Sequence, residues 1–305
     1  MSAIEVSGLR KAYGGVDAVC GVSFDVAAGE VFALLGPNGA GKTTTVEILE
    51  GFRRADAGEV RVLGSDPWSG GTRLRERIGL VLQQSGVHPF QRVREVVELF
   101  GGYYPRPRPT HEVLRLVGLE EQADSLVRTL SGGQARRLDV ALAIVGAPEV
   151  VFLDEPTTGF DPGARRAAWS MLRDLADGGT TVFLTTHYMD EAQAVADRVG
   201  VMRAGELVAV GPPSTLRSAD AATVEIRFEL PAGAVLADLA ALAGGRPGRN
   251  GDRVSIEVAE PTAALHALTG WALDHGVPLG RLEVSRPTLE DVYLSLTGDD
   301  ERGPA

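Results

Sequence analysis

The sequence predicts an α/β protein with a mostly parallel central sheet, an antiparallel sheet at its edge and a smaller α+β domain at its C-terminal end. Three observations support this fold class. Over the first two-thirds of the chain, short apolar runs alternate with helix-like segments, a pattern typical of parallel sheets covered by helices. Two prolines and small polar residues predict a linker over Gly211–Asp220. The 305 residues also exceed the about 100 to 200 usual for one domain.

The first predicted domain covers residues 1–218 and contains buried strands. Each is a short apolar or β-branched run, as expected for a strand covered on both faces. These strands are Val31–Leu35, Ile78–Leu82, Val150–Leu153 and Thr181–Thr185. Before them, Ile4–Leu9 and Val16–Val26 alternate enough in polarity to predict the antiparallel edge sheet.

Helices are predicted between and after these strands from the spacing of their apolar residues. Pro148 lies just beyond the end of one of them, a common position for proline. The predicted helices are Thr43–Phe52, Gln91–Phe100, Glu112–Val117, Gly132–Val145, Ala164–Ala176 and Met189–Ala196. We interpret the charge clusters Arg136-Arg137 and Arg165-Arg166 as solvated helix faces.

The second predicted domain covers residues 219–305 and mixes strands with helices. Its expected strands are Thr223–Leu230, Arg253–Val258 and Leu279–Val284, its helices Ala234–Ala243, Thr262–His275 and Leu289–Leu296, and Gly244–Gly251 is interpreted as a turn-rich segment.

Composition bounds the function. The net charge of −11 disfavours nucleic acid as a partner, because such binding needs a basic footprint. We see no apolar run near the about 18 residues of a membrane span and no signal peptide at Met1–Arg10. A single cysteine, Cys20, excludes an internal disulfide. These features predict a reducing, cytosolic compartment.

One segment matches the phosphate-binding pattern G-x-x-x-x-G-K-[ST] and stands between a predicted strand and a predicted helix. Its glycines allow successive backbone N–H groups to point at one phosphate, and the helix N-terminus adds partial positive charge. The lysine then reaches the outer phosphates and the threonine hydroxyl is placed for Mg²⁺. The residues are Gly36, Pro37, Asn38, Gly39, Ala40, Gly41, Lys42 and Thr43.

The lysine content argues against a chance match. Lys11 and Lys42 are the two lysines among 30 basic residues. A lysine therefore stands at the position that needs a compact point charge, which the wide fork of arginine does not replace. We interpret the domain as a P-loop NTPase core.

Two acids follow the predicted strand Val150–Leu153. At the carboxyl end of a strand, Asp154 is placed to contact Mg²⁺ directly or through water. Glu155 follows where a base would polarise the water that attacks the γ-phosphate. An isolated acidic pair would be an ordinary loop, but here it accompanies a phosphate loop.

The segment Leu130-Ser131-Gly132-Gly133-Gln134 resembles the signature motif of ABC-transporter ATPases. At a helix N-terminus it forms a second anion-binding surface. The resemblance implies an α-helical signature subdomain and an ATP-dependent, head-to-tail homodimer. In that dimer the phosphate loop of one subunit, including Thr44, and Ser131, Gly132, Gly133 and Gln134 of the other hold one ATP.

Further landmarks match this family in order along the chain. Tyr13 resembles the aromatic residue that stacks on adenine, although an ordinary surface tyrosine remains an alternative. Gln83 resembles the glutamine that touches Mg²⁺ and water; the neighbouring Gln84 is the alternative register. Asp161, in a segment where Phe160 replaces the usual leucine, resembles the D-loop aspartate, and His187 resembles the switch histidine.

The resemblance also implies partners. Ser85–Tyr104 lies where such ATPases receive an integral-membrane permease, with a stripe of core aromatic residues as the alternative. The tail segment Arg286–Tyr293 resembles the accessory domain of drug- and antibiotic-export ATPases of the daunorubicin-resistance type.

We therefore predict an ATPase that uses ATP and Mg²⁺ to drive export through a separate permease, at the cytoplasmic face of the membrane. The expected catalytic residues are Glu155, His187 and Gln83, and the expected Mg²⁺ ligands are Thr43, Gln83 and Asp154. Two rivals are a soluble ABC ATPase that acts on ribosomes or DNA, and a protein that only binds nucleotide. The single phosphate loop and the acidic charge disfavour the first rival, and the presence of Glu155 disfavours the second.

Overall fold

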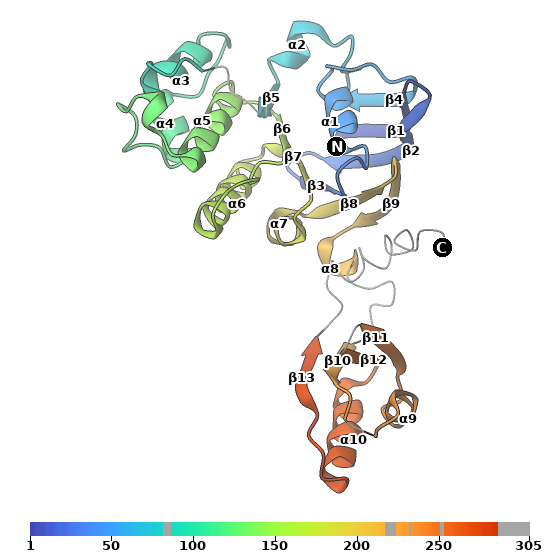
Figure 1. The fold of residues 1–305 in the computed structure, drawn as a ribbon. Coiled ribbons are helices and arrows are strands. Elements are labelled where there is room, and N and C mark those ends of the chain that lie inside the picture. The colour runs from blue at the N-terminus through green and yellow to red at the C-terminus, as the bar shows by residue number, and fades with distance from the viewer. Residues whose placement is uncertain (82–86, 217–223, 232, 251–252, 286–305) are drawn as a thin grey trace. The chain divides into compact units, whose positions relative to one another are not determined.

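The structure is a computed structural model that describes residues 1–81, 87–216, 224–231, 233–250 and 253–285 (Figure 1). The chain divides into two compact units, Met1–Pro213 and Ser214–Ala305, which are described one at a time. The predicted helix Leu289–Leu296 and the tail segment Arg286–Tyr293 lie outside the described residues.

A six-stranded sheet forms the centre of the first unit, in the order β5-β6-β7-β3-β8-β9. All neighbouring pairs are parallel except β8 and β9. This confirms the mostly parallel sheet predicted from buried, β-branched strands. The strands are β3 (Val31–Leu35), β5 (Ile78–Val81), β6 (Val150–Asp154), β7 (Thr181–Thr186), β8 (Arg198–Arg203) and β9 (Glu206–Gly211).

An antiparallel sheet of three strands, in the order β2-β1-β4, packs against this centre. Its strands are β1 (Ser2–Tyr13), β2 (Val16–Ala27) and β4 (Ala57–Val62). The first two correspond to the predicted edge segments Ile4–Leu9 and Val16–Val26.

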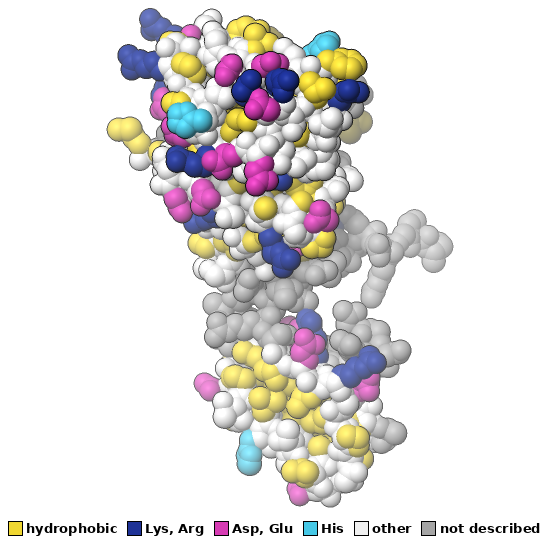
Figure 2. Space-filling model, turned by 90° about the vertical axis from the view of Figure 1, so that its left-hand side faces the viewer, with side chains coloured by type: hydrophobic (Ala, Val, Ile, Leu, Met, Phe, Trp, Pro, Cys, Tyr) yellow, Lys and Arg dark blue, Asp and Glu magenta, His cyan; other side chains and the backbone are white. Residues whose placement is uncertain are grey.

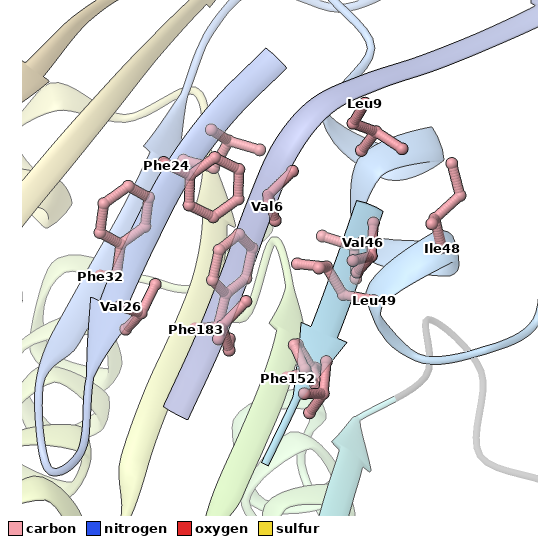
Figure 3. Packing of buried hydrophobic residues seen from close by; sticks show 14 of the residues in the cluster. Val6, Leu9, Phe24, Val26, Phe32, Val46, Ile48, Leu49, Phe152 and Phe183 are labelled. Atoms are coloured by element: carbon pink, nitrogen blue, oxygen red, sulfur yellow. The ribbon is translucent and has the colours of Figure 1, made fainter. Parts of the chain in front are cut away.

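Stacked phenylalanine rings join the two sheets. Phe24 of β2 stacks on Phe32 of β3 with ring centroids 5.2 Å apart, and Phe32 stacks on Phe183 of β7 at 5.6 Å. Figure 3 shows these rings beside apolar side chains of the first helix, α1, such as Val46 and Leu49. The cluster therefore anchors α1 and the strand before it, β3, to the rest of the unit.

Helices of the first unit form two groups (Figure 1). One group packs together beside β5 and comprises α3 (Val93–Gly101), α4 (Thr110–Leu116) and α5 (Gly132–Ile144), with the short 3₁₀ helix η1 (Val127–Thr129) before α5. The others follow strands of the sheet or connect the two sheets: α1 (Lys42–Leu49), α2 (Gly71–Arg75), α6 (Pro162–Asp177) and α7 (Met189–Val195). On the face shown in Figure 2, acidic and basic side chains of the described residues are interspersed.

The second unit has the order β-α-β-β-α-β and a sheet in which β10 and β12 are the inner strands. All its described strand pairs are antiparallel, so the unit has the split βαβ topology of ferredoxin-like domains. Ile226, Phe228 and Leu268 are fully buried in its core. Its elements are β10 (Val224–Glu229), α9 (Leu236–Leu242), β11 (Arg246–Asn250), β12 (Arg253–Val258), α10 (Pro261–Asp274) and β13 (Gly280–Ser285), preceded along the chain by α8 (Pro213–Leu216).

Several elements were not expected from the sequence. The segment Gly244–Gly251, interpreted as turns, contains the edge strand β11. Proline and glycine are tolerated in β11 because an edge strand pairs on one side only. The strands β4, β8 and β9 and the helix α2 were also missed. Among the described residues, no helix combines the length and apolar content needed to cross a membrane.

Replacing Phe183 by alanine is expected to destabilise the first unit by about 3–5 kcal/mol, because the ring is fully buried and stacks on Phe24 and Phe32. Urea unfolding followed by circular dichroism measures the change. The matched control is Val16→Ala at a side chain that is 71% exposed, with an expected effect within about 0.5 kcal/mol. Equal effects of the two substitutions would contradict the packing described here.

Candidate nucleotide site

The carboxyl ends of three neighbouring parallel strands meet at one edge of the central sheet. Leu35, the last residue of β3, pairs with Thr186 of β7, and Asp154, the last residue of β6, pairs with Thr185. In open α/β sheets, ligands bind outside the carboxyl ends of the strands. The phosphate loop, the acidic pair and the segment with His187 all begin at this edge.

The loop between β3 and α1 depends on glycine at defined positions. Gly39 and Gly41 have φ of 82° and 99°, in the left-handed region that favours glycine. A Cβ atom at Gly41 would collide with the Ala18 carbonyl oxygen, and one at Gly36 would lie 2.6 Å from the Met202 carbonyl oxygen. The backbone of Ala18 and Met202 therefore packs closely against the loop. This packing fixes the loop backbone and, with it, the directions of its N–H groups.

Lys42 is the first residue of α1, and its buried side chain reaches back to the start of the loop. Its Nζ donates to the carbonyl oxygens of Gly36 at 2.7 Å and Pro37 at 3.1 Å and lies 4.0 Å from Glu155 Oε1. Burial lowers the pKa of Lys42, and the nearby carboxylates of Glu155 and Asp154 oppose that shift. The loop thus presents a cation that is poorly solvated and available to an anionic ligand.

Thr43 and Thr44 follow in the first turn of α1, Thr43 exposed and Thr44 half-buried. Thr43 and Asp154 line the same cavity of about 240 Å³. A hydroxyl and a carboxylate are the oxygen ligands that Mg²⁺ prefers, so these residues fit the predicted metal. Gln83, the third predicted ligand, and the alternative Gln84 lie outside the described residues.

Glu155 occupies a strained turn directly after β6. Its φ is 47°, a conformation that costs about 1–2 kcal/mol for a residue with a Cβ atom. Its N–H donates to the carbonyl oxygen of Thr185 at 3.2 Å and to Thr185 Oγ1 at 3.1 Å. The Thr185 hydroxyl in turn donates to Asp154 Oδ1. One threonine of β7 thereby positions both acids.

Three side chains converge on the Glu155 carboxylate. His187 Nδ1 lies 3.2 Å from Oε1, and Thr158 Oγ1 donates to Oε2 at 3.2 Å. Lys42 is the third. The structure thus brings together Lys42, Glu155 and His187, which the sequence analysis singled out from three separate segments. The arrangement can accept a proton or hold a water beside a bound phosphate.

The segment Ser131–Gln134 starts α5 with reciprocal capping bonds. The Gln134 N–H donates to Ser131 Oγ at 3.3 Å, and the Ser131 N–H donates to Gln134 Oε1 at 2.9 Å. Ser131 and Gly132 are exposed. Gly132, Gly133 and Glu155 line a groove of about 510 Å³ to which the phosphate loop does not contribute.

Asp161 and Tyr13 have local partners. The Asp161 carboxylate caps α6 by accepting from the Ala164 N–H at 3.0 Å and the Gly163 N–H at 2.9 Å, and these bonds lower its pKa. Tyr13, at the end of β1, is 40% exposed, and Lys11 and Arg53 lie over its ring at 5.5 and 5.4 Å.

Comparison with known proteins identifies the family. The chain is 39% identical to the daunorubicin resistance ATP-binding protein DrrA3 of Streptomyces coeruleorubidus, over 99% of this chain and 98% of that protein. It is likewise 39% identical to the Nod factor export ATP-binding protein I of Ralstonia nicotianae, over 98% and 95% of the two chains. The chain belongs to the ATP-binding subunits of ABC transporters.

Family models and solved structures agree with this assignment. The model described as ABC transporter matches residues 19–158, and the model for the C-terminal domain of ABC transporter domain-containing proteins matches residues 224–288. The structure of cbiO1 from Clostridium perfringens has a TM-score of 0.65 and 29% identity, covering 72% of this chain and 92% of that one. A bacterial ABC transporter cassette solved as a dimer has a TM-score of 0.60 and 25% identity, covering 68% and 98%.

As an ABC ATPase, the chain binds and hydrolyses ATP, and its family works with a membrane permease. The motifs of the sequence predict this family, and the relatives confirm it.

The structure adds residues of this ABC ATPase that the sequence did not reveal. Glu191 of α7 is fully buried and accepts from Thr157 Oγ1 at 2.7 Å and Trp169 Nε1 at 3.2 Å; burial raises its pKa. Arg136, interpreted as part of a solvated face, has a side chain only 14% exposed. For Arg136 that interpretation was wrong, because its side chain contacts the backbone carbonyl oxygens of Asp154 and Pro156 instead of solvent.

Glu50 is a further carboxyl group near the site. It lies at the C-terminal end of α1 and lines the same cavity as Thr43 and Asp154. Burial, followed by the negative charges of Asp154 and Glu47, raises the pKa of Glu50 to about 8. In the sequence Glu50 is the second of two acids in this segment, after Glu47, and the local pattern does not distinguish it from a solvated carboxylate.

Glu50→Gln is expected to stabilise the metal-free protein at pH 8 and to have little effect at pH 5. The pKa of Glu50 is about 8 in the folded chain and about 4.5 in the unfolded chain. Between these two pH values the folded chain keeps a proton that the unfolded chain has lost, so the free energy of unfolding falls as pH rises through this range. We expect a gain of about 1–3 kcal/mol at pH 8, measured by urea unfolding with EDTA at both pH values. Glu98→Gln, at an exposed position of α3, is the control, and a gain independent of pH would contradict this account.

Proposed function

We propose that this chain is the energy-coupling subunit of an exporter for a drug-like or antibiotic-like molecule. The proposal is supported by the relatives whose names state daunorubicin resistance and Nod factor export, since both align over nearly the full chain. The observation that carries the chemistry is the convergence of Lys42 and His187 on Glu155.

In the proposed reaction, ATP lies on the loop Gly36–Thr44 with its outer phosphates at Lys42. Glu155 holds the attacking water and takes its proton, while His187 lies on the γ-phosphate side. Attack of that water on the γ-phosphorus breaks the bond to ADP and releases phosphate. The strained turn at Glu155 keeps its carboxylate at the loop rather than in solvent.

Thr43 and Asp154 would hold Mg²⁺, together with Gln83. The ion supplies positive charge that offsets the charge developing on the phosphates. The hydroxyl and carboxylate donors of Thr43 and Asp154, which share one cavity, support this assignment.

A head-to-tail homodimer completes the proposed site. Ser131, Gly132, Gly133 and Gln134 of one subunit would contact the ATP on the loop of the other, Tyr13 would stack on adenine, and Asp161 would lie at the dimer contact. Ser131 and Gly132 are exposed, and the groove that Gly132 and Gly133 line contains no phosphate-loop residue. Both observations support a contact in trans.

The permease would hold the dimer at the cytoplasmic face of the membrane. Phe90 and Tyr103 are 63% and 71% exposed, so these residues of Ser85–Tyr104 are not the core stripe that was the alternative. Exposed aromatic side chains suit a protein interface. Residues 219–305 would form the accessory domain.

Glu155→Gln is expected to keep ATP affinity within about twofold and to lower kcat by about 10²–10⁴, because the amide cannot accept the proton. Lys42→Ala should weaken ATP binding by about 10-fold or more, since hydrogen bonds to charged groups contribute ~1.5–3 kcal/mol. Equilibrium binding of fluorescent ATP and phosphate release measure the two effects.

The matched control is Glu149→Gln, at an exposed residue beside the opposite end of β6, which should hydrolyse ATP normally. Full turnover by Glu155→Gln would remove Glu155 from the proposed mechanism.

Purification of tagged Glu155→Gln protein from its native cells, in mild detergent with ATP, is expected to recover a multi-span membrane protein. The variant should trap the ATP-bound dimer on its permease, and mass spectrometry identifies what is retained. Lys42→Ala under the same conditions is the control. Recovery of ribosomal or DNA-associated proteins without a membrane protein would contradict the exporter proposal.

A further inference from the structure

Arg136 connects the signature segment to the turn that carries Glu155. It lies on α5, five residues after Ser131. Its Nη2 donates to the Asp154 carbonyl oxygen at 3.0 Å, and its Nε donates to the Pro156 carbonyl oxygen at 3.4 Å. These two carbonyl groups stand on either side of Glu155.

The contact acts on a backbone that needs support. Glu155 has φ of 47°, and strained residues persist only where their surroundings hold them. Thr185 binds the Glu155 N–H. Arg136 holds the carbonyl groups before and after the same residue, so the turn is fixed from β7 by Thr185 and from α5 by Arg136.

The guanidinium is itself well positioned. The Arg136 side chain is 14% exposed and lies 3.6 Å from Asp139, which is 12% exposed. Burial lowers the pKa of Arg136, opposed by Asp139. A planar guanidinium can bind two acceptors in a fixed geometry, which one ammonium group does not reproduce. A movement of α5 would therefore displace the backbone at Glu155 through these contacts.

We propose that Arg136 is a positioning residue that makes the placement of Glu155 depend on the signature segment of the same chain. The inference rests on the proposed head-to-tail dimer, in which that segment contacts the ATP held by the partner subunit. When the signature segment of one chain contacts the ATP held by its partner, it positions the Glu155 carboxylate of the same chain. That carboxylate acts on the ATP bound to its own phosphate loop. The two ATP sites are coupled through each chain.

Arg136→Met is expected to lower kcat by about 10- to 100-fold, because a displacement of about 1 Å in a catalytic group has effects of this size. Affinity for fluorescent ATP should stay within about twofold, and Arg136→Lys should recover only part of the loss. Arg173→Met is the matched control: Arg173 also binds a carbonyl group and a carboxylate, those of Val195 and Asp197, away from Glu155. It should retain normal kcat.

Mixed dimers separate action within a chain from action across the dimer. Two differently tagged copies are purified in sequence with ATP. The reference is a dimer of one wild-type chain and one Glu155→Gln chain, which has a single active Glu155. When Arg136→Met is added to the Glu155→Gln chain, the ATPase rate should equal that of the reference, because the chain with the active Glu155 keeps its own Arg136. When Arg136→Met is placed in the other chain, the one with the active Glu155, the rate should be about 10-fold lower than that of the reference.

The opposite ranking, or a normal kcat for Arg136→Met, would overturn the role of Arg136. Failure of the proposed function gives a different result: wild type would not form an ATP-dependent dimer, or Glu155→Gln would hydrolyse ATP normally. A loss of kcat with equal loss in Arg173→Met, accompanied by a lower Tm in both, would show a merely structural contact and would also overturn the inference.

Discussion

The site depends on the parallel pairing of β3, β7 and β6. Parallel strands place their carboxyl ends at one edge, with neighbours about 4.8 Å apart. The pairs Leu35–Thr186 and Asp154–Thr185 therefore bring three loops, far apart in sequence, within reach of single side chains. The phenylalanine stack across β2, β3 and β7 stabilises this pairing. The same core contacts therefore hold the strands whose ends carry the site residues.

Charge at this edge is concentrated and only partly neutralised within the chain. The Lys42 ammonium is buried against the carbonyl groups of its own loop, and removal of an ammonium from water is costly unless it is paired. In the neighbouring cavity, the negative charge of Asp154 disfavours ionisation of the Glu50 carboxyl group. A polyanion at Lys42 and a divalent cation between the oxygen donors would reduce both costs, which is a physical argument for the proposed binding of ATP with Mg²⁺ at this edge.

Side chains from other elements hold the segment from Asp154 to Asp161 in place. Glu191 binds Thr157, Thr185 binds the start of the segment, and Arg136 binds its carbonyl groups. These contacts come from α7, β7 and α5, which are different elements of the unit. A shift of one of these elements would therefore change the geometry at Glu155 without any change in the residues proposed to contact the phosphate.

By itself, the sequence determined the fold class and the family, and it pointed to candidate site residues in short contiguous motifs, such as Gly36–Thr43 and Ser131–Gln134. Such motifs can be interpreted because backbone conformation and local spacing dictate their chemistry. The tertiary structure alone decided the rest: the raised pKa of Glu50, the buried contacts of Glu191, and the attachment of Arg136, which the sequence suggested was solvated. These properties arise from burial and from contacts between segments 18 or more residues apart, and neither is encoded in local spacing.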